Sequence, residues 1–193
     1  MNIDQRRAHR YDALLAAGIE LLGAPDGPKV AVRAACRLAG LTERYFYESF
    51  TDRDAFVRAV YAHVGEQATS TIADAVASAH GRAKAEAPVR AFVELVLDNP
   101  NLGRVLLLAP LSEPAIGGSG KALVPSFVDL VGAQLTTLDA DEQHLIAVGV
   151  VGALTALFVG YLDGSITTPR GRFLAHCVRL VADAGLPARA DVP

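Results

Sequence analysis

Apolar residues recur at helical spacing along most of the chain, and Gly and Pro residues interrupt them at intervals. The first helical segment follows Asp4, which can cap a helix, and it ends before Gly23 and Pro25. No stretch of useful length alternates apolar and polar residues as a strand does, and no internal repeat is evident. The pattern therefore predicts an all-α protein.

Two short helical segments follow the first one, at residues 32–39 and from Thr42 to about residue 50. Between them lies Gly40, which we expect to adopt the left-handed conformation of a tight turn. Thr42 is a good N-cap residue, so the second short helix is expected to begin there. Residues 51–54 resemble a capping box and open a long helix that reaches about residue 79. Two short helices joined by a glycine turn are typical of a helix-turn-helix.

The rest of the chain predicts a larger helical body, with a Gly-, Ser- and Pro-rich segment at 112–120 that is expected to form a mobile loop. Its expected helices cover about 87–97, 101–109, 121–138, 141–163 and 170–184. The predicted organisation is a helix-turn-helix domain of three helices at 1–50, a linking helix at about 52–79, and a helical domain at 80–193.

The segment from Leu145 to Leu162 contains no charged residue for 18 positions, which is long enough to span a bilayer. Acidic residues flank it on both sides, and no cluster of Lys and Arg anchors either end. We therefore expect a helix buried in protein on all sides and no membrane contact.

Composition adds little catalytic chemistry. The two cysteines are far apart and form neither a disulfide framework nor a metal-binding spacing, which favours a reducing cytoplasm. The first ten residues are polar and basic, unlike a signal peptide. The sequence shows no nucleophile with a nearby base, no phosphate-binding glycine loop and no Glu-x-x-His pair. We expect no enzyme activity, no catalytic residue, no metal and no cofactor.

Charge gives weak support for nucleic-acid binding. The chain carries a net charge of −3, but residues 1–64 hold nine basic against eight acidic side chains. Arg6, Arg7 and Arg10 form either an arm on DNA phosphates or a solvated start of the first helix.

The second short helix carries the candidate DNA-binding residues. Small residues on the first short helix would pack against Phe46 and Phe50, which turns the opposite face outward. Arg44 can donate to guanine or to a phosphate, and hydroxyl groups can bond phosphates. The candidates are Arg33, Thr42, Glu43, Arg44, Tyr45, Tyr47 and Arg53.

Residues 32–42, 45–50 and 52–56 resemble the DNA-binding domain of the tetracycline-repressor (TetR) family, and the similarity covers about residues 6–64. The resemblance implies that Tyr47 contacts a phosphate and that Phe50 is a core residue linking to the long helix. It also implies that Arg53 stands where the family usually carries a phosphate-binding lysine. Two departures are the pair Ala35-Cys36 in place of Ile-Ala, and Arg44 where a small residue is common.

The same resemblance implies that the remaining helices bind a small molecule and form a homodimer. A small, mainly apolar effector would release a repressor from a palindromic operator on double-stranded DNA. The ligand candidates, which are also ordinary core or surface residues, are His63, Phe92, Val96, Phe127, His144 and Phe158.

Small residues give independent support for a dimer, because they recur every four positions on the uncharged helix and let another helix approach closely. The interface candidates are Gly152, Ala156, Gly160, Phe173, Cys177 and Leu180. The alternative reading is a helical protein-interaction module that needs no small-molecule ligand.

Overall fold

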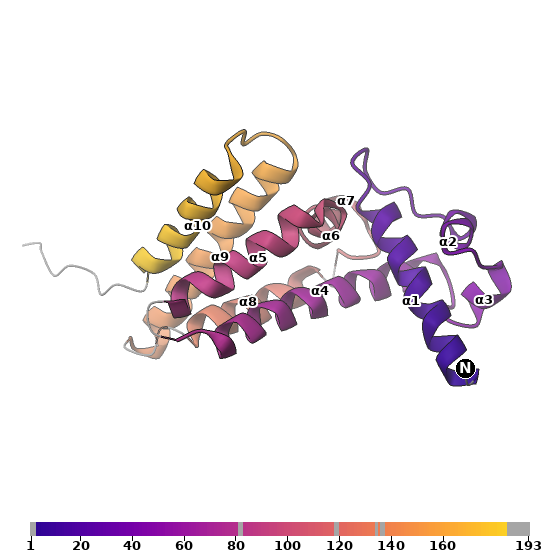
Figure 1. The fold of residues 1–193 in the computed structure, drawn as a ribbon, viewed down its shortest axis with the longest axis horizontal. Coiled ribbons are helices and arrows are strands. Elements are labelled where there is room, and N and C mark those ends of the chain that lie inside the picture. The colour runs from indigo at the N-terminus through magenta and orange to yellow at the C-terminus, as the bar shows by residue number, and fades with distance from the viewer. Residues whose placement is uncertain (1–2, 81–82, 118–119, 134, 136–137, 185–193) are drawn as a thin grey trace, which may run out of the picture. The chain divides into compact units, whose positions relative to one another are not determined.

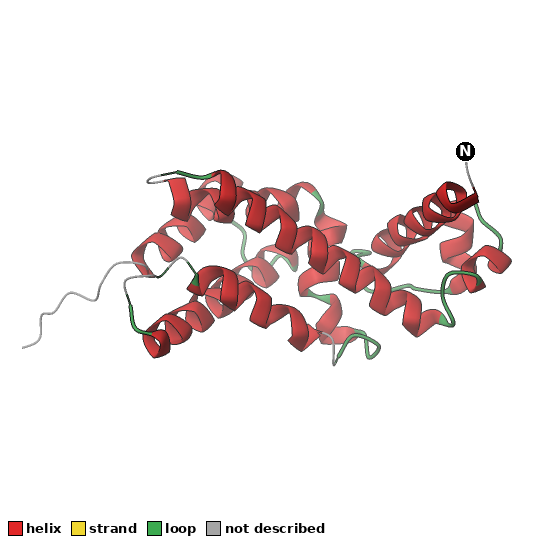
Figure 2. Ribbon diagram, turned by 90° about the horizontal axis from the view of Figure 1, so that it is seen from below, coloured by secondary structure: helices red, strands yellow, loops and turns green. Residues whose placement is uncertain are grey.

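The computed structural model of the chain describes residues 3–80, 83–117, 120–133, 135 and 138–184. These residues form ten helices and no strand, which confirms the expected all-α class (Figures 1 and 2). In chain order the helices are α1 (Ile3–Leu22), α2 (Val32–Ala39), α3 (Glu43–Tyr47), α4 (Arg53–Ser78), α5 (Ala83–Asp98), α6 (Pro100–Leu107), α7 (Ala109–Ser112), α8 (Gly120–Gly132), α9 (Ala140–Leu162) and α10 (Arg170–Ala184).

The bounds of α2 and α10 agree with the expected ones, whereas α5 begins at Ala83, four residues before the expected start, and three further predictions differ. The single helix expected at 101–109 is divided into α6 and α7, and α8 ends at Gly132 rather than near residue 138. Helix α3 ends at Tyr47, before the expected residue 50. Ser112 closes α7, residues 113–117 form turns, and residues 118–119 of the expected loop lie outside the described part.

The start of α4 is capped differently from the expected box. The Ala55 backbone N–H donates to the Asp52 carboxylate at 2.7 Å, so Asp52 caps the helix. Thr51, the expected capping residue, donates its hydroxyl to Asp52 instead, at 3.3 Å. The box prediction is therefore wrong by one position, and α4 begins at Arg53, one residue after the expected start.

The chain packs as two compact units that do not follow its order. The first comprises Met1–Gln67 and Val96–Lys121, and the second comprises Ala68–Leu95 and Ala122–Pro193. The segment 96–121 therefore packs with the N-terminal helices, whereas we expected it in the C-terminal body. The functional division near residue 80 stays a prediction.

Aromatic rings form the core of the first unit. Phe46 and Phe56 are fully buried with ring centroids 5.2 Å apart, and Phe50 lies 5.0 Å from Phe56. Tyr11 of α1 stacks on Phe50 at 5.2 Å. These contacts tie α3 to α1 and α4, which confirms the expected role of Phe50 as a core residue next to the long helix.

In the second unit, rings from α5, α8, α9 and α10 meet. Phe92 lies 5.9 Å from Phe127 and 5.0 Å from Phe158, and Phe158 lies 5.2 Å from Phe173. Val128 and Val151 extend this apolar packing between α8 and α9.

Helix α9 is the described helix that is long and apolar enough to cross a membrane by length and composition. Only 28% of its apolar 18-residue stretch is buried within the chain. The expectation that this helix is buried on all sides is therefore wrong for a single copy. Leu145 is 68% exposed, and Gly149, Gly152 and Ala156 continue the exposed face at helical spacing.

Candidate nucleic-acid interface

Helices α2 and α3 are joined by the tight turn that the sequence predicts. Gly40 has φ 66° and ψ 31°, a left-handed conformation that strongly favours glycine. The Leu41 backbone N–H donates to the Cys36 carbonyl at 2.9 Å, which closes the end of α2. Ala35 and Cys36 are buried beneath the turn, and these small side chains allow α2 and α3 to approach closely.

Thr42 occupies the N-cap position of α3 through its backbone. It is extended, at φ −90° and ψ 159°, and its carbonyl accepts from the Tyr45 N–H at 3.0 Å. Its side chain makes no capping hydrogen bond, but its extended backbone makes it the N-cap residue, as expected, and the helical residues begin at Glu43. The Thr42 hydroxyl is thereby left on an exposed residue at the front of the helix.

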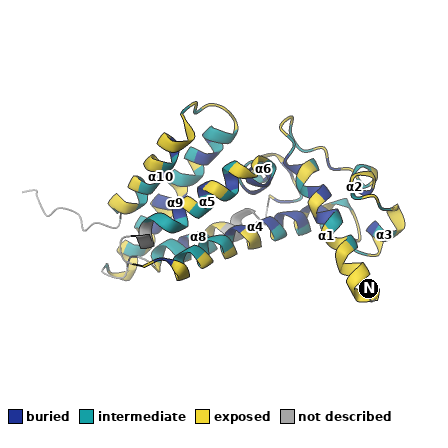
Figure 3. Cartoon of the chain, in the orientation of Figure 1, coloured by how far each residue is buried: buried dark blue, intermediate teal, exposed yellow. Residues whose placement is uncertain are grey.

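One face of α3 is buried and the other is open. Phe46 is fully buried, whereas Tyr47 is 56% exposed, and Thr42, Glu43 and Arg44 are also exposed. The ribbon of α3 accordingly carries both buried and exposed colours (Figure 3). The structure thus brings four of the expected DNA-binding residues together on one accessible surface.

The arginines of this surface are paired with carboxylates. Arg33 Nε donates to Glu43 at 3.1 Å, and Arg44 Nε donates to Glu48 at 3.1 Å. The two arginine side chains are largely exposed and the two glutamates somewhat less than half, so such pairs contribute little to folding and can exchange for other partners. Sequence reasoning missed Glu48, although its position four residues after Arg44 on the helical pattern could have indicated it.

Tyr45 is less accessible than expected because α1 covers it. The Arg10 guanidinium lies 4.3 Å from the centre of the Tyr45 ring, a cation–π contact, and 4.0 Å from the Glu48 carboxylate. Arg7 reaches the Glu48 carbonyl at 3.5 Å. The basic start of α1 thus packs beside α3.

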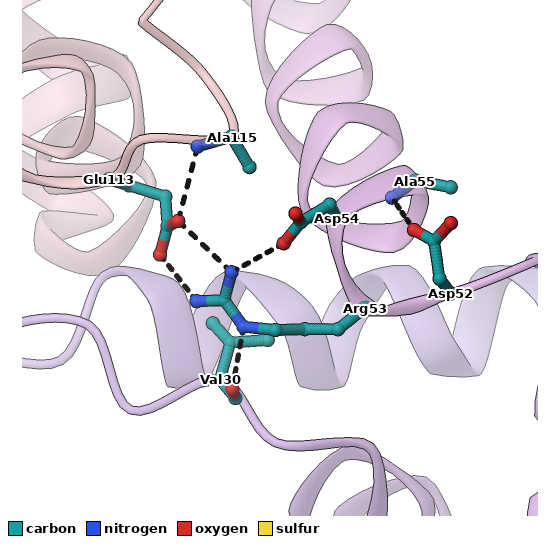
Figure 4. Close-up of polar contacts among 7 residues, drawn as sticks. All are labelled: Val30, Asp52, Arg53, Asp54, Ala55, Glu113 and Ala115. Atoms are coloured by element: carbon teal, nitrogen blue, oxygen red, sulfur yellow. Dashed lines mark hydrogen bonds and ion pairs between the residues drawn. The ribbon is translucent and has the colours of Figure 1, made fainter.

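Arg53, the first residue of α4, forms a dense set of contacts (Figure 4). It binds both carboxylate oxygens of Glu113, at 3.0 and 2.5 Å, and its Nε donates to the Val30 carbonyl at 3.1 Å. Asp54 accepts a further hydrogen bond at 2.8 Å. Glu113 also accepts from the Ala115 backbone N–H at 3.3 Å.

These contacts fix both charges. The hydrogen bond from Arg53 lowers the pKa of Glu113 below its usual range, and the same bond raises the pKa of Arg53. Sequence reasoning missed Glu113 because it lies 60 residues from Arg53, with no local pattern connecting the two.

The expected ligand residues do not form one group. Phe92, Phe127 and Phe158 share the ring cluster of the second unit, with Phe92 and Phe127 only partly buried. Val96 is fully buried and His63 half-buried, and both belong to the first unit. His144 is exposed on α9, so the chain does not enclose it. No group of His, Cys, Asp and Glu among the described residues could hold a metal ion.

The expected interface residues also divide. Gly152 and Ala156 are exposed on α9, and Leu180 on α10 is partly buried. Phe173 and Cys177 are 2% and 0% exposed and face the chain's own core, which corrects the expectation that they meet a partner. Gly160 is covered by Ile166, because a Cβ there would lie 2.8 Å from the Ile166 side chain.

Solved structures share this arrangement of helices. A TetR-like transcriptional regulator from Rhodococcus sp. RHA1 superposes with a TM-score of 0.71 at 17% identity, covering 90% of this chain and 93% of that one. The chain has the fold of the TetR-family regulators. A TetR-family regulator from Streptomyces coelicolor gives a TM-score of 0.70 at 17% identity, covering 95% of this chain and 80% of that one.

A third TetR-fold structure, a TetR-family transcription regulator from Marinobacter aquaeolei VT8, gives a TM-score of 0.67 at 15% identity. The superposition covers 94% of this chain and 98% of that one. No family model and no curated protein sequence matches the chain. The TetR fold is therefore recognised from structure, over nearly the whole chain.

Proposed function

We propose that the protein is a DNA-binding transcriptional regulator of the TetR type whose helix α3 lies in the major groove. The observation that carries the proposal is the two-faced α3: Phe46 anchors it in the core, while Glu43, Arg44 and Tyr47 are presented together to solvent. The left-handed turn at Gly40 sets the direction in which α3 leaves α2, and so helps to keep these side chains exposed. Such a regulator would act on DNA in the cytoplasm.

The exposed side chains suit different parts of DNA. Arg44 can donate two hydrogen bonds to guanine, and Glu43 can accept from the amino group of cytosine. Thr42 and Tyr47 can bond phosphates through their hydroxyls, as can Arg33 through its guanidinium. Arg33 and Arg44 would exchange their carboxylate partners, Glu43 and Glu48, for DNA.

We also propose a homodimer that joins through α9. One apolar face of α9 is left exposed by the chain, and small residues on it allow a second helix to come close. This face consists of Leu145, Val148, Gly149, Gly152 and Ala156. Two copies would present two α3 helices to a palindromic operator.

The effector we propose is a small, mainly apolar molecule that contacts the partly buried rings of Phe92 and Phe127. Its binding would favour a conformation of the dimer with weaker operator affinity, as in a repressor.

Selection of binding sites from random duplex DNA tests the proposal directly. We expect one enriched palindromic sequence, with affinity that falls steeply as salt rises. Replacing Arg44 by Ala together with Tyr47 by Phe should weaken binding to that sequence by about tenfold to a hundredfold. Undiminished binding by this double variant would refute the role of α3, and an absence of enrichment would refute the regulator.

A further inference from the structure

Glu113 is buried at 5% exposure, although it carries a charge and lies outside the exposed α3 surface. Burying a carboxylate is unfavourable unless it is paired and hydrogen-bonded. Arg53 and the Ala115 backbone N–H supply those partners. Stability alone is a weak explanation for a buried ion pair, because apolar residues of similar volume are often equally stabilising in the same place.

The geometry leaves Arg53 little capacity for DNA. A guanidinium has five N–H groups. Four of them already donate within the protein: one to the Val30 carbonyl, one to Asp54 and two to Glu113. A phosphate could be bound by the remaining N–H alone, unless the contacts with Glu113 were broken.

The same contacts join the two ends of the helix-turn-helix. Val30 lies just before α2 and Arg53 begins α4, so the segment between them contains α2, the Gly40 turn and α3. The bond from Arg53 to Val30 closes this segment across 23 residues, and Glu113 orients the guanidinium that makes it (Figure 4).

We infer that Arg53 and Glu113 form a clamp that positions the helix-turn-helix, and that Arg53 is a positioning residue rather than a phosphate contact. The inference rests on the proposed function of α3. It makes Glu113, an acidic residue 60 positions away, a requirement for tight operator binding. A lysine cannot replace Arg53, because its single ammonium cannot bind both Glu113 oxygens and Val30 in the same fork.

The clamp and a phosphate contact predict opposite results for two variants that keep or raise the positive charge. If Arg53 bound a phosphate, Glu113→Gln would free it and tighten binding, and Arg53→Lys would bind as the parent does. If the clamp positions α3, both variants weaken binding by about tenfold, and the double variant is no weaker than either single one.

The experiment measures affinity for the selected operator over a range of salt concentrations, with circular dichroism to verify that each variant is folded. We expect the two losses at an unchanged salt dependence. Tighter binding by Glu113→Gln, or parental affinity of Arg53→Lys, would overturn the inference. Asp26→Asn is the matched control, because it removes one exposed carboxylate from a pair with Lys29 in the same unit, and it should change affinity less than about twofold.

Amide hydrogen exchange of the same variants needs no DNA and separates this inference from the proposed function. We expect faster exchange in residues 28–50 of Glu113→Gln and Arg53→Lys, but not of Asp26→Asn. Unchanged exchange would overturn the clamp. If the parent protein selects no DNA sequence, the regulator proposal fails, while faster exchange still supports the clamp as a structural device.

Discussion

The backbone of Asn101 occupies the space into which any side chain at Gly23 would extend. A Cβ at Gly23 would lie 2.1 Å from the Asn101 carbonyl oxygen and 2.6 Å from its carbonyl carbon. Gly23 directly follows α1, and Asn101 is the second residue of α6. The Asn101 side chain also donates to Glu20 at 2.6 Å, so α6 packs directly on the end of α1.

Replacing Gly23 by Ala should therefore destabilise the first unit. A rotamer change cannot relieve the contact, because the atoms in the way belong to the backbone. We expect a loss of roughly 2 kcal/mol, in the range for an overpacked site. For a chain of this size that loss lowers Tm by about 4–8 °C. Gly171→Ala is the control, since a Cβ there meets nothing within 4 Å, and equal Tm values for the two variants would contradict this packing.

The Arg53–Glu113 pair predicts a pH-dependent contribution to stability. Because its pKa is lowered in the folded chain, Glu113 contributes stability above the pKa of an unfolded glutamate, about 4.3, and loses it as pH falls through the lower folded value. At pH 7, Glu113→Gln should cost about 2 kcal/mol, a moderate figure because the Arg53 side chain is 37% exposed.

Thermal melts of the parent and Glu113→Gln at a series of pH values measure this contribution. The difference in Tm should be largest near neutral pH and shrink progressively below the unfolded pKa. A difference that stayed constant down to acid pH would show that the charge of Glu113 is not what stabilises the fold.

Substitution of Glu48 should change DNA affinity in the opposite direction to most substitutions on this surface. Its carboxylate pairs with Arg44 and lies 4.0 Å from Arg10, so it neutralises positive charge beside α3. Glu48→Gln should raise affinity for duplex DNA of any sequence by about threefold at low salt, and the gain should vanish at high salt. Fluorescence anisotropy with an unselected duplex would detect it, and weaker binding would argue that Glu48 holds Arg44 in its binding position.

A substitution at Gly152, on the exposed face of α9, tests the proposed dimer. A side chain there meets nothing within 4 Å in the chain, so Gly152→Glu should leave each copy folded. On an interface between two α9 helices the same change places bulk and charge where the helices meet. We expect the parent to sediment as a dimer and Gly152→Glu as a monomer.

Ala62→Glu is the matched control for this test, because it adds the same charge to an exposed position of α4. It should remain dimeric. A dimer that survives Gly152→Glu would place the interface elsewhere.

Local patterns predicted the elements of the first unit well. The helical range 32–39, the left-handed Gly40 and the core position of Phe50 follow from spacing and backbone chemistry that act within a few residues. Errors were small where several capping residues competed, as at Thr51 and Asp52, because either side chain can accept from the first turn.

Contacts between distant residues could not be predicted in the same way. In the sequence, Glu113 is an isolated acidic residue in a predicted loop, and only the fold brings it to Arg53. Nothing in the sequence around Asn101 indicates its contact with Gly23. The small residues of α9 predicted that Gly160 meets a partner helix, which is wrong, because Ile166 of the same chain covers Gly160. Periodicity identifies a face that can pack, whereas its partner depends on the tertiary fold.

The discontinuous first unit has a consequence for the order of events during synthesis. Its two parts, Met1–Gln67 and Val96–Lys121, are separated by a stretch that belongs to the other unit. A nascent chain that has emerged only as far as the end of α4 lacks both Asn101 and Glu113, which bind Glu20 and Arg53 in the folded unit. The helix-turn-helix would therefore mature late in translation, after most of α5 to α7 has left the ribosome, although it lies ahead of these helices in the chain.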